Sequence, residues 1–337
     1  MADLAFVAFE AVKLLSKTIL FLIKAAVTVG LIWFVLRGQD LSALGERLAD
    51  ISPLKVGAAI ALLAGQNVIA AQRWIVIMRL FGQALPYRVA LRFFFEGLFF
   101  NQALPSTVGG DGVRMYRAVK AGLPVAAGVK GVLLDRIAGL FGLLAIVALT
   151  QPWLYARVDD ISARSAFAVI IVAGVIGVSL LILCRRLPAD WVKWRVIRGL
   201  IGLSDGVVEL FRRADVALPV FGISVVGHLM MVLAIFILAR DLNLAITFVD
   251  CLVLIPGVML LSAVPISIAG WGVREAVMVA AMGLLGVTTD GSTSLSLIYG
   301  FSMVIIGLIG GMLWFANSDR RVGDLTPLPA SANDRKD

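Results

Sequence analysis

The sequence predicts an all-α polytopic membrane protein with about six full transmembrane helices and two broken helical hairpins. Of its 337 residues, 60% are apolar and only 15% are charged, whereas soluble domains average about 45–50% apolar and about 25% charged residues. Several uncharged runs reach the roughly 20 residues that a helix needs to cross a bilayer. An ordinary soluble enzyme is excluded, because so few charged groups cannot cover the surface of a soluble protein of this size.

Six continuous spans follow from the uncharged runs, and Arg, Lys or Asp residues stand at most of their ends. The first span has no small-residue cleavage site behind it, so it is expected to be a retained helix rather than a secretory signal. The spans are Thr18–Leu36, Val56–Gln72, Ala126–Leu149, Ser165–Cys184, Ala217–Ala239 and Leu295–Ala316.

Two further apolar stretches, Val89–Val113 and Cys251–Val273, contain several prolines and glycines. Proline removes a helical hydrogen bond and glycine weakens a helix, so neither stretch is expected to be one straight helix. Non-helical backbone at membrane depth persists only where it is buried in protein or lines a wet cavity. Both stretches are therefore expected to be re-entrant or discontinuous hairpins.

The basic residues support this arrangement and orient it. If both hairpins return to the face they enter, 20 of the 30 Lys and Arg residues fall on one face, seven on the other and three within spans. The face richer in these residues is normally the cytoplasmic one. The bias predicts a bacterial inner-membrane protein with both termini in the cytoplasm, and it accounts for the net charge of +8 without a nucleic-acid partner.

Residues 1–316 are expected to form a single transmembrane domain, followed by a disordered cytoplasmic tail, 317–337. The longest polar connection, 185–215, carries apolar residues at near-helical spacing between basic residues. This pattern is typical of an amphipathic helix at the inner interface or of a solvated cytoplasmic helix. In the last span, Gly307 and Gly311 would allow close helix contact, either within one chain or between two copies.

The two broken stretches share a sequence frame. Residues 103–114 read ALPSTVGGDGVR and residues 263–274 read AVPISIAGWGVR, so six of the twelve positions are identical. Three spans separate the copies, and an odd number reverses the face from which a hairpin enters. The halves, roughly 89–149 and 250–316, are therefore predicted to form an inverted repeat, an arrangement found in many transporters. Convergent use of proline and glycine in two membrane turns is the alternative.

The shared frame has the chemistry of an anion site. Pro105 and Pro265 interrupt each helix, and the glycines allow the backbone to turn and to approach a ligand. A helix that restarts there exposes backbone N–H groups, and Arg114 and Arg274 add planar donors suited to phosphate. The alternative for each arginine is that it extends to the nearest interface and affects only topology.

Acidic residues complete the candidate site. Glu96, Asp111, Asp135 and Glu275 lie in or beside apolar stretches, where an unpaired charge is costly. Asp135 and the adjacent Arg136 point in different directions on a helix, so each needs a partner on another element. Arg114 or Arg274 is a candidate partner for Asp135, and a purely structural ion pair is the alternative.

Metal and nucleotide chemistry have little support in the sequence, and no cofactor is expected. Cys184 and Cys251 are too few for a disulfide framework or a cysteine metal site. The single histidine, His228, lacks a second histidine nearby and is interpreted as packing or hydrogen bonding locally. No Gly-x(4)-Gly-Lys-Ser/Thr loop for a nucleotide is present.

The run from Asn101 to Arg114, the sequence Leu134-Asp135-Arg136 and the run from Pro265 to Glu275 resemble the lysylphosphatidylglycerol synthase transmembrane region family. This is the flippase-like domain also found at the front of the multiple peptide resistance factor, and the resemblance extends from about Lys17 to Ala316. It implies a domain that moves lipids between leaflets. Longer relatives carry a soluble aminoacyl transferase, which is not expected here, so the synthase activity is not carried over.

The resemblance also implies a set of substrate-binding residues that surrounds the two frames. With Asn101, which opens the first motif, the expected set is Pro105, Ser106, Gly109, Gly110, Asp111, Arg114, Asp135, Arg136, Pro265, Gly270, Gly272, Arg274 and Glu275.

The expected function is that of a flippase or translocase for a phospholipid or a related anionic amphiphile, and not that of an enzyme. One alternative is an integral membrane enzyme of lipid-linked glycan or aminoacyl-lipid synthesis, although the sequence offers little acid/base equipment. Another is an accessory subunit that recruits a soluble lipid-modifying enzyme through residues 185–215. Membrane lipids are the expected partners, and a second copy of the chain is a further candidate.

Overall fold

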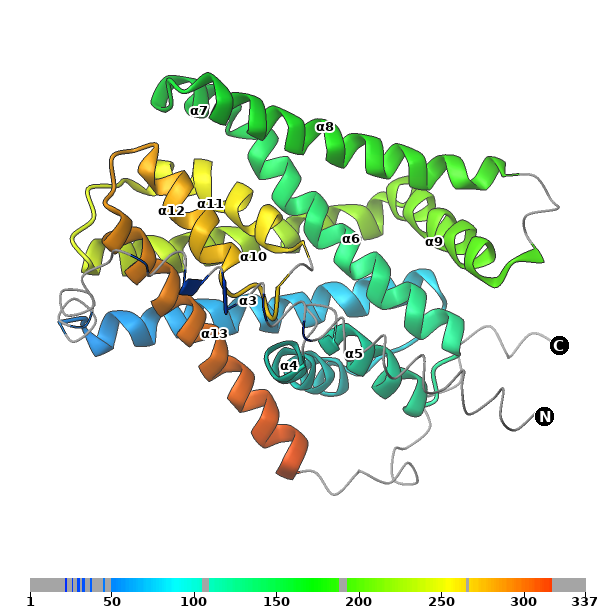
Figure 1. Ribbon diagram of the computed structural model, residues 1–337. Helices are drawn as coiled ribbons and strands as arrows, with labels where there is room; N and C mark the ends of the chain where they lie inside the picture. The colour runs from blue at the N-terminus through cyan, green and yellow to red at the C-terminus, as the bar shows by residue number, and fades with distance from the viewer. Residues whose placement is uncertain are drawn as a thin grey trace, which may run out of the picture.

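The computed structural model describes residues 50–104, 109–187, 193–264 and 267–316, together with isolated positions between 22 and 45. In this part of the chain every regular element is a helix (Figure 1). The predicted all-α fold is therefore confirmed. Most of the predicted span Thr18–Leu36 and the tail 317–337 lie outside the described residues.

Among the described residues, five helices are long and apolar enough to cross a bilayer, and they coincide with five of the six predicted spans. The second predicted span ended at Gln72, but its helix continues to Leu80. Arg73 directly follows the predicted span and was counted among the basic residues of the cytoplasmic face. It is instead buried within that helix. The five helices are α3 (Pro53–Leu80), α6 (Val125–Leu149), α8 (Ile161–Leu183), α10 (Ala214–Asp241) and α13 (Thr289–Ala316).

Both broken stretches form pairs of short helices. In the first pair, α4 (Tyr87–Ala103) packs on α5 (Gly109–Lys120), and in the second pair, α11 (Phe248–Ser262) packs on α12 (Val273–Gly283). The helices break within the shared proline and glycine frames, as the sequence predicts. That each pair re-enters the membrane from one face stays a prediction.

The order long, short, short, long occurs twice among these helices, first in α3–α6 and again in α10–α13. We call α3–α6 the first set and α10–α13 the second set. The contacts of the two sets correspond: α4, the second helix of the first set, packs on α13, the last helix of the second set, and α11 packs on α6 in the same way. The leading helices of the two sets, α3 and α10, pack against each other. This pattern supports the predicted internal repeat and adds α3 and α10 to its halves, whereas inversion across the membrane stays a prediction.

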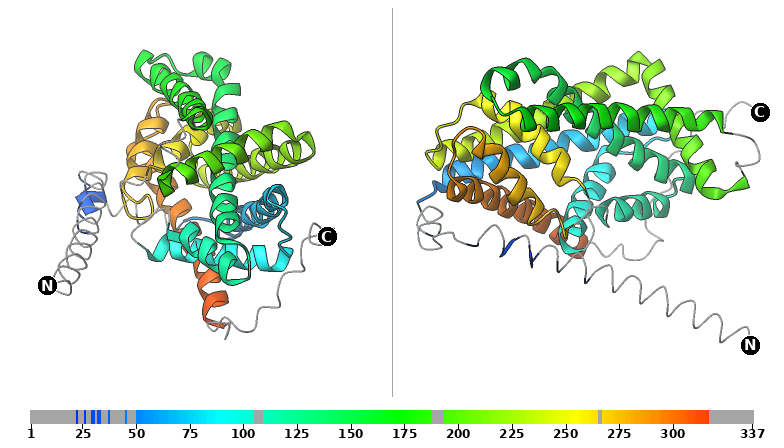
Figure 2. Two further views of the ribbon diagram at one scale, coloured as in Figure 1. Left: turned by 90° about the vertical axis from the view of Figure 1, so that its right-hand side faces the viewer. Right: turned by 45° about the horizontal axis from the view of Figure 1, so that its top comes forward.

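In the described part of the chain, four elements lie between the two sets: α7 (Gln151–Arg157), α8, the 3-10 helix η1 (Cys184–Arg186) and α9 (Arg195–Arg212). One face of α9 is buried on the bundle through Leu203, Val207 and Leu210, so the segment 185–215 does contain an amphipathic helix. By contrast, α8 lies on the outside of the bundle and buries very little of its surface (Figure 2).

The glycines of α13 allow it to pack closely on α4. Gly307 faces Gln102, and Gly311 faces the ring of Phe99. Between them, a Cβ atom added at Gly310 would overlap the backbone carbonyl of Phe95. The close contact predicted for Gly307 and Gly311 therefore occurs within one chain.

Replacing Gly310 with Ala should destabilise the protein, because the added methyl group meets backbone that cannot change rotamer. Overpacking of this kind typically costs about 1–3 kcal/mol. Thermal unfolding in detergent should show a lower midpoint for Gly310→Ala. The control is Gly222→Ala on α10, where an added Cβ meets no atom within 4 Å. Equal midpoints for the two variants would contradict the close α4–α13 contact.

Cysteine labelling tests the predicted orientation. Cys184 at the end of α8 is partly exposed, whereas Cys251 on α11 is buried, so only Cys184 should react. A membrane-impermeant maleimide should label Cys184 in inside-out vesicles and not in right-side-out vesicles. A Cys184→Ser, Asp159→Cys variant should show the reverse pattern, because the exposed Asp159 lies at the other end of α8. Labelling of Cys184 in right-side-out vesicles would show that the predicted orientation is wrong.

Candidate functional site

A polar, partly open cavity of about 240 Å³ lies among the helices of the bundle. Its walls come from α3, α4, α5, α6 and α10, with Ala263 at the end of α11. Most of its polar lining comes from helices of the first set. The polar residues at its surface are Gln66, Asn67, Arg73, Asn101, Asp111, Arg114, Asp135, Arg136, Ser224 and His228.

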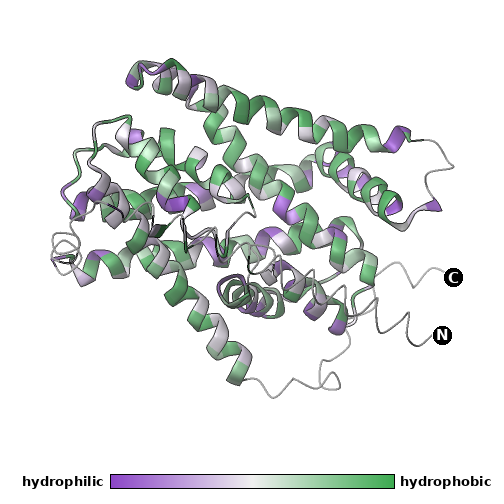
Figure 3. Cartoon of the chain, viewed as in Figure 1, coloured by the Kyte–Doolittle hydropathy of each residue, from purple (hydrophilic) through white to green (hydrophobic). Residues whose placement is uncertain are grey.

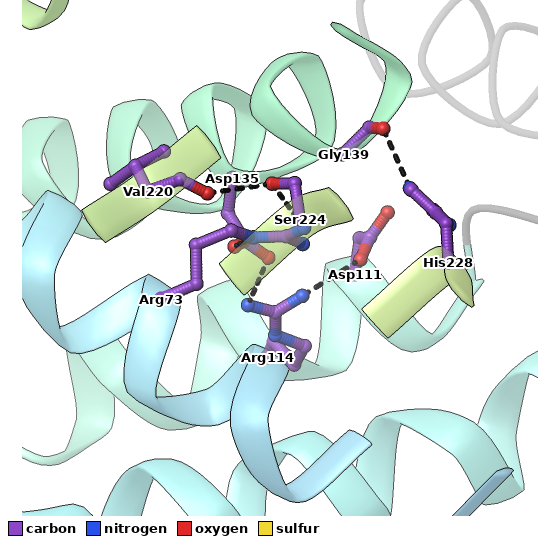
Figure 4. A network of polar contacts seen from close by, with 8 residues as sticks. All are labelled: Arg73, Asp111, Arg114, Asp135, Gly139, Val220, Ser224 and His228. Atoms are coloured by element: carbon purple, nitrogen blue, oxygen red, sulfur yellow. Dashed lines mark hydrogen bonds and ion pairs between the residues drawn. The ribbon is translucent and has the colours of Figure 1, made fainter. Parts of the chain in front are cut away.

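Asp135 on α6 is at the centre of the charged network in this cavity (Figure 4). Its side chain is almost completely buried, and each carboxylate oxygen accepts a hydrogen bond from a different arginine. Arg73 of α3 donates from Nε to Oδ1 at 2.8 Å, and Arg114 of α5 donates from Nη2 to Oδ2 at 3.0 Å. One carboxylate therefore connects three helices.

Asp111, at the first turn of α5, extends the network to a third arginine. It pairs with Arg114 at 3.5 Å, and its other oxygen accepts a hydrogen bond from Nε of Arg136. The adjacent residues Asp135 and Arg136 thus find their partners on other helices, as the sequence predicts. Arg114 is the partner expected for Asp135, whereas the contribution of Arg73 was not predicted.

The network carries a net positive charge, because three arginines and two aspartates line the described cavity. Arg114 is held between two aromatic rings, with its guanidinium carbon 4.5 Å from the ring centre of Trp74 and 4.0 Å from that of Phe94. These rings stabilise the cation and fix its orientation. Nε of Arg114 is buried and has no hydrogen-bond partner among the described residues, so this donor remains available to a ligand.

His228 provides an acceptor on the opposite wall, on α10. Its Nε2 lies 2.9 Å from the carbonyl oxygen of Gly139, and a carbonyl can only accept, so Nε2 carries the proton. In the neutral ring Nδ1 is then an acceptor, and it has no partner in the described part of the chain. The local hydrogen bond predicted for His228 is therefore confirmed, and the residue also lines the cavity.

Arg274 and Glu275 of the second frame form a separate cluster. Nη2 of Arg274 donates to Oε1 of Glu275 at 2.6 Å, and Ser296 of α13 hydrogen-bonds to both residues. The other oxygen of Glu275 accepts from the backbone N–H of Gly272 at the start of α12. Neither charged residue lines the polar cavity, so the structure does not bring Arg274 beside Arg114.

The matched glycines of the two frames have different conformations. Gly110 lies within α5, where a Cβ atom would overlap the carbonyl of Gly97, and its N–H donates to Asn101 at 2.8 Å. Gly270 and Gly272 instead have φ angles of 79° and 82° in the turn before α12. Glycine is required by close helix contact in the first frame and by a left-handed backbone in the second.

The remaining predicted residues are placed as follows. Gly109 begins α5 and packs on Leu104 rather than lining the cavity. Glu96 is fully buried outside the cavity, where Arg117 of α5 donates to it at 2.8 and 2.9 Å. Pro105, Ser106 and Pro265 lie outside the described residues.

The family model described as the lysylphosphatidylglycerol synthase TM region matches residues 21–311. This range includes every residue that lines the polar cavity. A comparison with curated proteins gave no match. The chain therefore belongs to the lysylphosphatidylglycerol synthase transmembrane region family.

Proposed function

We propose that this protein moves an anionic phospholipid between the leaflets of the membrane by admitting the lipid head group to the polar cavity. Membership of the family indicates a membrane protein of lipid metabolism or transport. The observation that carries the finer proposal is the cavity itself, a positively charged space among membrane helices with a buried arginine donor not yet satisfied.

The charges of the cavity fit a phosphodiester. A lipid phosphate carries one negative charge, which would balance the one positive charge left over by the three arginines and two aspartates. Nε of Arg114 is free to donate to it, and the side chain of Arg136 is 45% exposed at the same network. Inside a bundle, where water does not compete strongly, charged hydrogen bonds of this kind contribute about 1.5–3 kcal/mol each.

The neutral groups of the cavity fit the rest of a polar head group. Nδ1 of His228 can accept a hydrogen bond from a hydroxyl group. Asn67 uses its amide N–H to reach the carbonyl of Leu63 at 2.7 Å, which leaves its side-chain oxygen as a second acceptor. An anionic phospholipid with hydroxyl groups on its head, such as phosphatidylglycerol, would therefore satisfy both the cationic and the acceptor groups.

We propose transport rather than catalysis for this site. Both aspartates are already paired with arginines, so neither presents an unpaired carboxylate that could act on a substrate. The proposal therefore involves no covalent step. The location we propose is a bacterial inner membrane, with both termini in the cytoplasm.

Replacing Arg114 should slow lipid movement. In proteoliposomes with fluorescent phosphatidylglycerol, Arg114→Lys should reduce the translocation rate about tenfold, because lysine keeps the charge but loses the planar donors and the aromatic stacking. Arg114→Ala should reduce it further. Quenching of the outer-leaflet fluorophore gives the rate, and thermal unfolding of each variant measures how far the loss of the Asp135 partner destabilises the fold.

The matched control for this variant is Arg274→Lys. Arg274 is also buried beside aromatic rings, at 4.7 Å from Trp271 and 5.4 Å from Tyr299, but it does not line the cavity. The translocation rate of Arg274→Lys should stay close to that of the unmodified protein. Equal rates for Arg114→Lys, Arg114→Ala and the unmodified protein would refute the cavity as the head-group site.

A further inference from the structure

An apolar groove of about 280 Å³ runs between α6 and α8. One face of α6 forms its first wall, with Ile137, Phe141 and Leu144 at the helical spacing i, i+4, i+7. The second wall is the facing side of α8 from Ile170 to Leu181. Figure 3 shows that α8 is apolar along most of its length. The groove is therefore a site for hydrocarbon and not for a polar molecule.

Two glycines on α8 line the groove and differ in the space around them. A Cβ atom added at Gly177 would meet no atom within 4 Å, so this residue faces open space. At Gly174, one turn earlier, an added Cβ would press on the side chain of Leu144 across the groove. A larger residue at Gly177 would fill the open space of the groove, whereas Gly174 allows α8 to approach Leu144 of α6.

The groove adjoins the polar cavity. Leu140 of α6 lines both, and it lies one turn after Arg136 of the charged network. At the end of α11, Leu260 lines the groove while Ala263, three residues later, lines the cavity. Helix α6 and the end of α11 therefore border both the groove and the polar cavity.

The length of the groove matches one acyl chain. From Ile170 to Leu181, α8 rises by about 16 Å at 1.5 Å per residue. The hydrocarbon core is roughly 30 Å thick, so one leaflet contributes about half of it, and the groove is about as long as one leaflet is deep. A lipid with its phosphate at the charged network could therefore extend one chain along α8 within a single leaflet.

We propose that the α6–α8 groove binds an acyl chain of the same phospholipid whose phosphate occupies the polar cavity. This inference rests on the proposed function and specifies its substrate as a two-part ligand, an anionic head group with a hydrocarbon chain. It distinguishes the groove from the remaining lipid-facing surface, where occupancy does not depend on the head group.

Photolabelling of the purified protein tests this inference separately from transport. The probes are phosphatidylglycerol and phosphatidylcholine that carry the same diazirine in one acyl chain, and labelled peptides of α6 and α8 are quantified by mass spectrometry. Phosphatidylglycerol should label the groove residues about tenfold more than phosphatidylcholine does. Both lipids carry the phosphodiester, but the choline cation adds positive charge to a positively charged cavity and has no hydroxyl group for His228 or Asn67, and one charged interaction is worth about that factor in affinity. Arg114→Ala, which removes the phosphate contact, should lower the labelling by phosphatidylglycerol.

Groove-filling variants complete the experiment. Gly177→Phe should remove groove labelling by phosphatidylglycerol, and Ala173→Leu on the same wall should reduce it. Gly222→Phe, at an open glycine outside both spaces, should leave the labelling unchanged. Equal labelling by the two lipids, or labelling unaffected by Arg114→Ala, would show an ordinary lipid-facing surface and overturn the inference. Translocation that fails while head-group-dependent labelling persists would refute the proposed transport and leave the groove intact.

Discussion

The pairing of Asp135 with two arginines constrains how the helices of the first set are arranged. A carboxylate in the interior of a membrane protein is costly unless it is paired and hydrogen-bonded. Asp135 meets this requirement only if α3, α5 and α6 approach one another at the depth of Arg73 and Arg114. Buried pairs add little net stability over apolar packing, but removing one partner typically costs about 3–5 kcal/mol. The network therefore selects one arrangement of helices more than it strengthens the fold.

The two sets of helices use the same sequence frame for different purposes. In the first set, Arg114 reaches a carboxylate on another helix, and a cavity remains between them. In the second set, Arg274 is satisfied by its neighbour Glu275 and by Ser296, away from that cavity. Position 135 has no acidic counterpart at the matching place on α13, where Leu295 stands. The polar cavity is accordingly lined mainly by one of the two sets of helices.

Much of this arrangement could be predicted from the sequence because its cause is local. The helix breaks follow from proline and glycine, and the partner of Asp135 follows from the cost of a lone buried charge. Arg73 was missed because a charged residue normally ends an apolar run, and its partner is 62 positions away. The separate location of Arg274 was also not predicted. Adjacent residues on a helix were expected to point apart, as Asp135 and Arg136 do, but Arg274 pairs with its neighbour Glu275 at the first turn of α12. The partner of Arg73 depends on a tertiary contact, and that of Arg274 on local side-chain geometry, and the spacing of residues encodes neither.

The glycine contacts on two sides of α4 determine which parts of the molecule can move. Gly310 of α13 lies against the carbonyl of Phe95, and Gly110 of α5 lies against that of Gly97. Where backbones touch, no side chain can change rotamer to absorb a displacement, so α4, α5 and α13 behave as one rigid body. A displacement of α6 relative to this body would separate Arg114 from Asp135. A phosphate that replaces the carboxylate on Arg114 would compensate for that loss, so the ligand itself would lower the barrier to the motion.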